Sequence, residues 1–185
     1  MMDINKAQEV LDQYISDEKM KNHCYASEMV MRALARKLGR DEEKWAVAGL
    51  LHDIDAEITD KDPNRHALEA EPILKQYDVD DEVIDAIKMH NEEATGKERY
   101  SEFQHALAAG ETITGLIIAT TLVYPDKKIQ SVKPKSIRKR MKEKGFAASV
   151  NRDAIRECEK IGIHLDEFIE ISLNAMKEID SKIGL

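Results

Sequence analysis

The chain has 185 residues, which is enough for one domain with a substantial core and too few for two of comfortable size. Hydrophobic residues make up 42% of it and charged residues 35%, a balance that suits a folded, surface-charged helical protein and excludes wholesale disorder. The net charge of −8 disfavours a general nucleic-acid binder, so the composition argues against nucleic acid as a partner.

The sequence gives no sign of a targeting or membrane segment. No run approaches the roughly 18 to 20 apolar residues that cross a bilayer, and the start, "MMDINKAQEV", lacks the basic and apolar stretches of a secretion signal. Cys24 and Cys158 lie far apart and form no CxxC pair, so they indicate neither a disulfide framework nor a zinc site. We therefore expect a cytoplasmic protein with no membrane partner.

The first half of the chain has the residue spacing of amphipathic helices. Asp3 is placed to cap a first helix, a second is expected over residues 19–38 and ends at Gly39, and Asp41 precedes a third, "EEKWAVAGLLHDI". After the loop-like "TDKDPNR", helical patterns resume at "HALEAEPILKQY" and "DDEVIDAIKMHNEE".

The second half contains the most apolar segment, "SEFQHALAAGETITGLIIATTLVY". Its "TITGLIIATT" portion is β-branched and could form a strand, but length and flanking context favour a central helix. Pro134 could start a basic helix, Asn151 or Asp153 could cap another that ends at Gly162, and a last helix is expected over 165–183. No repeat or domain boundary is evident, so we predict one all-α domain, residues 1–185.

A basic segment stands out against the acidic chain. "KPKSIRKRMKEK", residues 133–144, holds seven basic residues and one acidic residue. The helical spacing of Lys135, Arg138 and Lys142 could place them on one face. Attraction of a small anion and an ordinary solvated helix face are both open interpretations of this segment.

His52 and Asp53 stand side by side directly after the apolar run of residues 46–51. A buried histidine and a buried aspartate are costly unless they are paired, hydrogen-bonded or bound to a metal. Further imidazoles and a carboxylate occur within or at the ends of other predicted helices: His23, His66, His90 and Glu111. Each alone is more often structural, but as a set they suit iron, manganese, zinc or a similar divalent ion.

The order of these residues resembles the HD superfamily of metal-dependent phosphohydrolases. His23 is followed by His52 and Asp53 within "LLHDID" and later by Glu111, and "HDID" resembles the motif of the HDIG-like subgroup. The resemblance covers roughly residues 19–122, which would form the metal-site core of a helical HD-type domain, with the basic segment and C-terminal helices at 133–185. Glu111 stands where the family usually has aspartate, one methylene shorter. The glycine-tyrosine-proline signature of cyclic dinucleotide phosphodiesterases is lacking, so their activity is not implied.

The resemblance implies a ligand set and a reaction. His23, His52, Asp53 and Glu111 would hold one divalent ion, and His66 and His90 would hold a second, with Asp53 bridging the two as the catalytic residue. One or two ions of iron, manganese, cobalt, nickel, zinc or magnesium are possible. A metal-bound hydroxide would attack phosphorus in a small anionic phosphorylated substrate, expected to be a nucleotide. Its phosphate would be held by basic residues, for which the candidates are Lys135, Arg138, Lys139, Lys142 and Arg152.

Two other functions stay open. A few HD-fold proteins resembling this one use two iron ions to oxidise small molecules with oxygen, and a non-catalytic module could bind a nucleotide for regulation. Asp55 and Glu57 are either proton donors or partners of the ligands, or else surface residues, and we interpret His105 and His164 as structural or surface residues. The sequence leaves the oligomeric state open.

Overall fold

All regular secondary structure in the described part of the chain is helical, which confirms the all-α prediction. The computed structural model describes residues 2–60 and 62–185, so Met1 and Lys61, the latter in the predicted loop "TDKDPNR", lie outside the description. The α-helices are Ile4–Tyr14 (α1), Glu18–Leu38 (α2), Glu42–Leu51 (α3), Ala70–Gln76 (α4), Asp81–His90 (α5), Glu92–Thr95 (α6), Glu102–Leu122 (α7), Pro134–Lys142 (α8), Arg152–Arg156 (α9), Leu165–Lys177 (α10) and Asp180–Ile183 (α11). Ile129–Ser131 (η1) and Glu157–Ile161 (η2) are short 3-10 helices.

Aspartate side chains set the starts of the first helices by accepting hydrogen bonds from N–H groups of the first turn that have no partner within the helix. Asp3, Asp17 and Asp41 do so for α1, α2 and α3. α2 ends at Gly39, whose φ of 67° is a left-handed conformation that glycine adopts without strain. The predicted caps Asp3 and Asp41 and the predicted end at Gly39 are confirmed.

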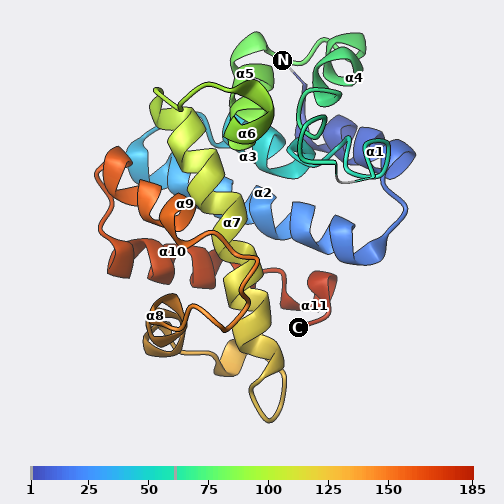
Figure 1. The fold of residues 1–185 in the computed structure, drawn as a ribbon. Coiled ribbons are helices and arrows are strands. Elements are labelled where there is room, and N and C mark those ends of the chain that lie inside the picture. Colours follow the sequence, from blue (N-terminus) through green and yellow to red (C-terminus); the bar gives the residue numbers. More distant parts are fainter. Residues whose placement is uncertain (1, 61) are drawn as a thin grey trace.

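The long helices α2 and α7 cross in the middle of the molecule, as Figure 1 shows, and α2 also packs against α3 and α10. The contact between α2 and α3 is made by backbone atoms: a Cβ atom added at Gly49 would lie 2.5 Å from the carbonyl oxygen of Ser27. This close approach places the end of α3 beside the middle of α2. Fully buried side chains fill the space between the helices, among them Met31, Leu34, Leu50, Leu107, Ile113 and Phe168.

α7 contains the β-branched stretch "TITGLIIATT" and is helical throughout. Ser101 and Gln104 form a capping box at its start, and the hydroxyls of Thr120 and Thr121 bond back to carbonyls one turn earlier. By length and composition α7 could cross a membrane, although no apolar run of that length was expected from the sequence. However, 67% of its apolar window is buried inside the protein, as expected of a core helix.

Some predicted helices are shorter or interrupted, and the breaks shape the site. The helix predicted at "HALEAEPILKQY" begins only at Ala70, because Ala67 has a φ of 73° and reverses the backbone. The helix predicted at "EEKWAVAGLLHDI" ends at Leu51, so "HDID" lies in turns. The pattern "DDEVIDAIKMHNEE" breaks at Asn91, between α5 and α6. Because His52, Asp53 and His66 lie in turns, the directions of their side chains are not fixed by the 100° rotation per residue of a helix.

Candidate metal centre

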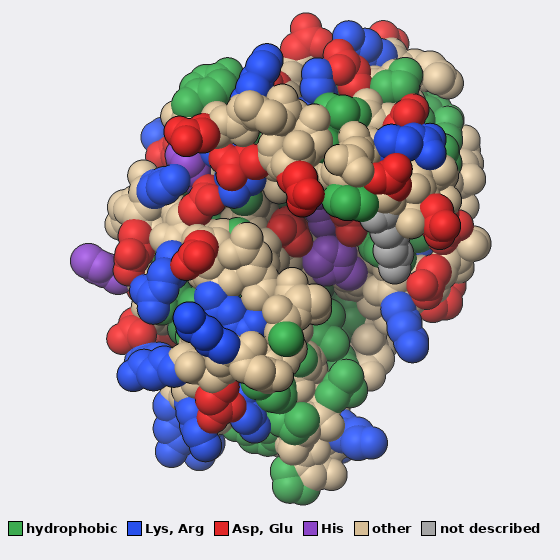
Figure 2. All heavy atoms as spheres, in the orientation of Figure 1, with side chains coloured by type: hydrophobic (Ala, Val, Ile, Leu, Met, Phe, Trp, Pro, Cys, Tyr) green, Lys and Arg blue, Asp and Glu red, His purple; other side chains and the backbone are tan. Residues whose placement is uncertain are grey.

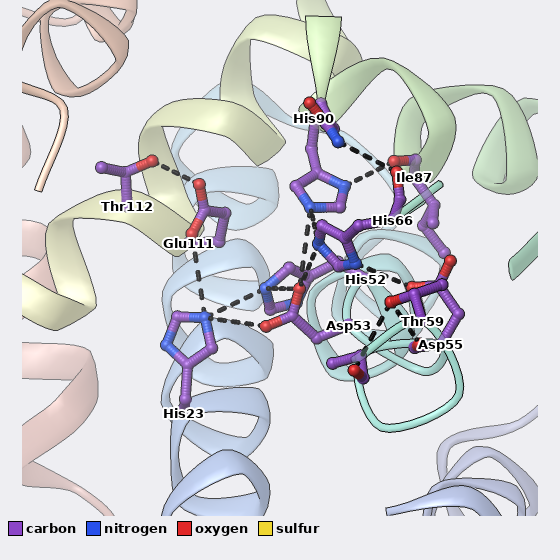
Figure 3. A network of polar contacts seen from close by, with 12 residues as sticks. His23, His52, Asp53, Asp55, Thr59, His66, Ile87, His90, Glu111 and Thr112 are labelled. Carbon is purple, nitrogen blue, oxygen red and sulfur yellow. Dashed lines mark hydrogen bonds and ion pairs between the residues drawn. The ribbon is translucent and has the colours of Figure 1, made fainter. Parts of the chain in front are cut away.

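Six residues from three helices and two turns meet in one place (Figure 3). His23 lies on α2, Glu111 on α7 and His90 at the last position of α5. The others belong to the turns described above: His52 and Asp53 directly follow α3, and His66 precedes α4. Figure 2 shows histidine and acidic side chains in a hollow on this face of the molecule.

The imidazoles face one another in two pairs. Nε2 of His23 lies 3.0 Å from Nε2 of His52, and Nε2 of His66 lies 3.1 Å from Nε2 of His90. The carboxylate of Asp53 lies between the pairs. Its Oδ1 is 3.0 Å from Nε2 of His66, and its Oδ2 is 3.6 Å from Nε2 of His23. Among the described residues, Asp53 is therefore the side chain that contacts both pairs.

The partners of the other ring nitrogens fix which nitrogen carries the proton. Nδ1 of His52 lies 2.8 Å from the Gly49 carbonyl oxygen, and Nδ1 of His90 lies 2.5 Å from that of Ile87. A carbonyl oxygen can only accept, so each Nδ1 must donate. In the neutral imidazoles, Nε2 then carries a lone pair and no proton.

The same holds for the remaining two histidines. Nδ1 of His66 lies 2.9 Å from Oδ1 of Asp55, which accepts. Nδ1 of His23 lies 2.9 Å from the hydroxyl oxygen of Thr114, whose own proton goes to the Glu111 carbonyl oxygen 2.7 Å away. Thr114 must therefore accept from His23. When the rings are neutral, these contacts leave all four Nε2 atoms as acceptors that point inward.

This arrangement fits divalent metal ions. Two acceptor nitrogens about 3 Å apart repel each other unless a cation or a proton lies between them, and neutral imidazole nitrogen is a common metal ligand. Two groups have ligand atoms all within 4.8 Å of one another: His23, His52 and Asp53 form one, and Asp53, His66 and His90 the other. Oδ2 of the fully buried Asp55 has no hydrogen-bond partner, a further polar atom left unsatisfied beside the second group.

Burial and charge act in opposite directions on these side chains. Burial lowers the pKa of His52 to about 3, which keeps its imidazole neutral and available as a ligand. Burial alone would raise the pKa of Asp53, but His52 and His66 hold it well below its usual value, so this carboxyl is ionised. Burial would lower the pKa of His66, and its hydrogen bonds to Asp53 and Asp55 instead raise it to about 10. The pair of His66 and His90 thus attracts positive charge.

Glu111 lies at the edge of the centre. Its Oε2 is 3.7 Å from Nε2 of His23, its other oxygen accepts from the Thr112 hydroxyl, and it belongs to neither of the two compact groups. Burial raises the pKa of Glu111. Glu111, the predicted fourth ligand of the first ion, therefore lies near His23 but outside the compact group of His23, His52 and Asp53.

The basic helix α8 does not reach the histidines. It packs against the far end of α7, where Lys139 and Arg140 line a separate cavity with Thr120. Thr120 is roughly 14 Å further along α7 than Glu111, at 1.5 Å per residue. Figure 2 shows Lys and Arg side chains gathered at the lower left, over α8.

The predicted phosphate contacts from α8 are therefore not placed at this centre. Arg138 pairs with Asp166 and Lys139 with Glu143, while Lys135 and Lys142 are exposed. The cluster of basic residues correctly indicated a basic helix face, but this face of α8 lies at the end of α7 that is distant from the histidines.

Arg152 also differs from expectation. As a candidate for holding the substrate phosphate it was expected at the metal centre, but its guanidinium donates to backbone carbonyls of the preceding loop, those of Glu143, Phe146, Ala147 and Val150. The loop itself lies at the mouth of the centre, since Ser149 and Asn151 line a cavity with His23 and Glu111. The charge of Arg152 is used to shape the loop.

Sequence reasoning missed some supporting residues. Asp55, for which the sequence left both a partner role and a surface role open, is fully buried beside His66, and its position two residues after Asp53 was the available signal. Thr114 was not singled out, although it lies one turn after Glu111. Asn91 donates to the carbonyls of Pro63 and His66 and so holds the turn that carries His66.

The other residues considered lie elsewhere. Glu57 accepts from the backbone N–H groups of Ser16 and Asp17 at the start of α2. His105 is buried and hydrogen-bonded to Glu157, and His164 is exposed at the start of α10. None of these side chains contacts the four histidines.

The chain belongs to the HD domain family, which its sequence matches over residues 20–122, more than half of its 185 residues. It is thus a member of the HD superfamily of metal-dependent phosphohydrolases.

Its relatives include proteins named Ribonuclease Y. Those of Mycoplasma capricolum subsp. capricolum and Mycoplasma mycoides subsp. mycoides SC are 38% and 37% identical over 82 residues. Each match covers 44% of this chain and only 16% of the relative. No solved structure matches significantly. Because these relatives are named as ribonucleases, the argument from composition against nucleic acid is no longer supported.

Proposed function

We propose that this chain hydrolyses the phosphate ester of a nucleotide with one or two divalent metal ions. The observation that carries the proposal is the convergence of four imidazole Nε2 atoms on the carboxylate of Asp53. Divalent ions bound there would lower the pKa of water and neutralise charge on a phosphoryl oxygen. Membership of the HD superfamily supports the same chemistry.

The contacts and exposure of the proposed metal ligands suggest a different role for each. Asp53 contacts both histidine pairs, so we assign it the catalytic role: its carboxylate would bridge the two ligand groups and set the distance between the ions they hold. His52 is almost completely buried, with 1% of its side chain exposed, whereas His23 and His66 expose 22% and 19%. The substrate phosphate would therefore approach along the side of His23 and His66, and His52 would form the inner wall.

The test is phosphate release from a panel of nucleotides and other phosphomonoesters. Metal-free protein is reconstituted separately with manganese, iron, cobalt, nickel, magnesium and zinc. Asp53→Ala should abolish release together with bound metal, and the matched control Asp81→Ala, at an exposed position in the first turn of α5, should change neither. Release that persists at wild-type rate in Asp53→Ala would contradict the proposal.

A second candidate is cleavage of the phosphodiester bond in RNA. The similarity to proteins named Ribonuclease Y favours it, over the 82 matched residues. A single-stranded oligoribonucleotide therefore belongs in the panel. Internal cleavage of that oligonucleotide, with no phosphate released from mononucleotides, would replace the first candidate by the second.

The two alternatives from the sequence have readouts of their own. A di-iron oxygenase would consume oxygen when loaded with iron and supplied with an organic substrate. A regulatory module would bind a nucleotide without releasing phosphate under any of the metals.

A further inference from the structure

The metal centre opens into a cavity of about 320 Å³ that His23 and Glu111 line on its inner side. Cavities that hold small ligands measure about 300–1,000 Å³, so this one is at the small end of that range. Its other walls come from α7, through Thr112 and Gly115, and from the segment before α9, through Ser149, Val150 and Asn151.

The walls are almost free of charge. Hydroxyl, amide and apolar groups line the cavity, and none of the described residues that line it is Lys or Arg. The charged group at its inner end is the carboxylate of Glu111. A further phosphate placed here would meet the acidic side chain of Glu111 and no Lys or Arg among the described lining residues, whereas an uncharged group with hydroxyls would find hydrogen-bonding partners.

We infer that this cavity receives the uncharged alcohol part of a phosphate monoester, and that Gly115 and the loop of residues 143–151 set the size of the alcohol that fits. The inference rests on the proposed function, since it assigns the phosphate to the metal centre. It narrows the substrate to a monoester such as a nucleoside monophosphate, in place of a polyphosphate or an oligonucleotide.

Arg152 is the positioning residue for the loop. Its Nη1 donates to the carbonyl oxygens of Ala147 and Val150 at 2.6 and 2.7 Å, and its Nη2 donates to those of Phe146 and Glu143. Hydrogen bonds from a charged donor are stronger than neutral ones, so one guanidinium closes the loop. This arrangement holds Val150 against the cavity.

Gly115 leaves room that other residues would fill. A Cβ atom added there would lie 3.4 Å from Cγ2 of Val150, an ordinary contact that needs no rearrangement. A larger side chain at this position would extend between α7 and the loop and reduce the cavity. Gly115 lies inside α7, where glycine is a poor helix former, so alanine there should also favour the helix.

The experiment compares Gly115→Ala and Gly115→Val with wild type on two monoesters, a nucleoside 5′-monophosphate and glycerol phosphate. Metal content is measured for each variant and is expected to be unchanged. Gly115→Val should lower kcat/KM for the nucleotide about tenfold, mainly through KM, because a hydrophobic wall discriminates by such factors for a small change in volume. For glycerol phosphate the change should stay within about twofold. Gly115→Ala should act in the same direction with a smaller effect, which keeps the test usable if the valine variant folds poorly.

Arg152→Gln is the second variant. It should raise KM for the nucleotide more than for glycerol phosphate and leave the metal content unchanged. Equal effects on both monoesters, or none in any variant, would overturn the inference while Asp53-dependent phosphate release still supports the proposed function. Hydrolysis of oligonucleotides alone would also overturn it. No hydrolysis of any substrate would overturn both proposals.

Discussion

Asp55 accepts a hydrogen bond from His66, with 2.9 Å between its Oδ1 and Nδ1 of the ring. The carboxylate is fully buried, and Thr59 bonds to the Asp55 carbonyl oxygen in the same turn. The bond holds the His66 proton on Nδ1 and turns Nε2 toward Asp53. One buried acid therefore orients a metal ligand that the chain supplies from a turn.

Replacing Asp55 by asparagine should weaken metal binding. An amide can present its NH2 group to the ring and no longer enforces the tautomer, and loss of such a supporting partner costs about 10- to 100-fold in metal affinity. Isothermal titration calorimetry of metal-free protein with manganese measures the change in affinity. Asp60→Asn, an exposed change in the same segment, is the control. Unchanged affinity in Asp55→Asn would contradict the role given to this bond.

The two ligand groups should be separable by mutation. His66→Ala removes a ligand from one group and leaves His23, His52 and Asp53 intact. We expect this variant to keep one ion per chain if wild type binds two, whereas Asp53→Ala should lose both. Metal-to-protein ratios after gel filtration report the result, with the exposed His164→Ala as the unaffected control. Loss of all metal in His66→Ala would show that the groups are not independent.

A buried ion pair behind the site should make stability depend on pH. Arg99 donates to both carboxylate oxygens of Glu157 at 2.8 and 2.7 Å and to the carbonyl oxygens of Met89 and His90. Burial would raise the pKa of Glu157, but the bonds from Arg99 and His105 lower it below its ordinary 4.5. The stabilisation from this carboxylate is therefore complete above pH 4.5 and is lost as the pH falls through the lower folded-state value.

Glu157→Gln measures this contribution. At neutral pH the variant should lose about 2 kcal/mol of unfolding free energy, since hydrogen bonds to charged groups contribute about 1.5–3 kcal/mol. The difference in unfolding free energy between wild type and variant should narrow as the pH falls below 4.5. Urea denaturation at each pH measures this difference. A gap that stays constant across this range would mean that the charge of Glu157 is not what stabilises the fold.

Gly49→Ala should destabilise the protein strongly. The added Cβ would lie 2.5 Å from the Ser27 carbonyl oxygen, which is backbone and cannot move aside without separating α2 from α3. Overpacking a core typically costs about 1–3 kcal/mol, and backbone contact places this change at the upper end. Thermal unfolding measures it, with Gly145→Ala as control, because a Cβ there would contact nothing within 4 Å. Equal melting temperatures would show that the two helices are less closely packed than described.

Local chemistry made much of the fold predictable. Aspartates before an apolar run and a glycine after it mark helix ends through contacts within a few residues, and Asp3, Asp41 and Gly39 behave as expected. His52 and Asp53 could be singled out because a histidine and an acid at the end of a buried run require partners, and the resemblance to the HD superfamily implied the other four proposed ligands. Residue spacing does not encode turns such as that at Ala67, where a fully buried alanine adopts a φ of 73°, a conformation that residues with a Cβ atom disfavour.

The sequence by itself determined the helical class and the ligand types, since both follow from local periodicity and from the cost of burying polar groups. Only the tertiary structure decided which charges reach the centre. Asp55 is buried against His66, whereas α8 packs roughly 14 Å away along α7. Arg152 donates its hydrogen bonds to carbonyl oxygens of the loop that precedes it. Those outcomes depend on how helices distant in sequence pack, and a side chain contacts whatever that packing brings within a few ångströms.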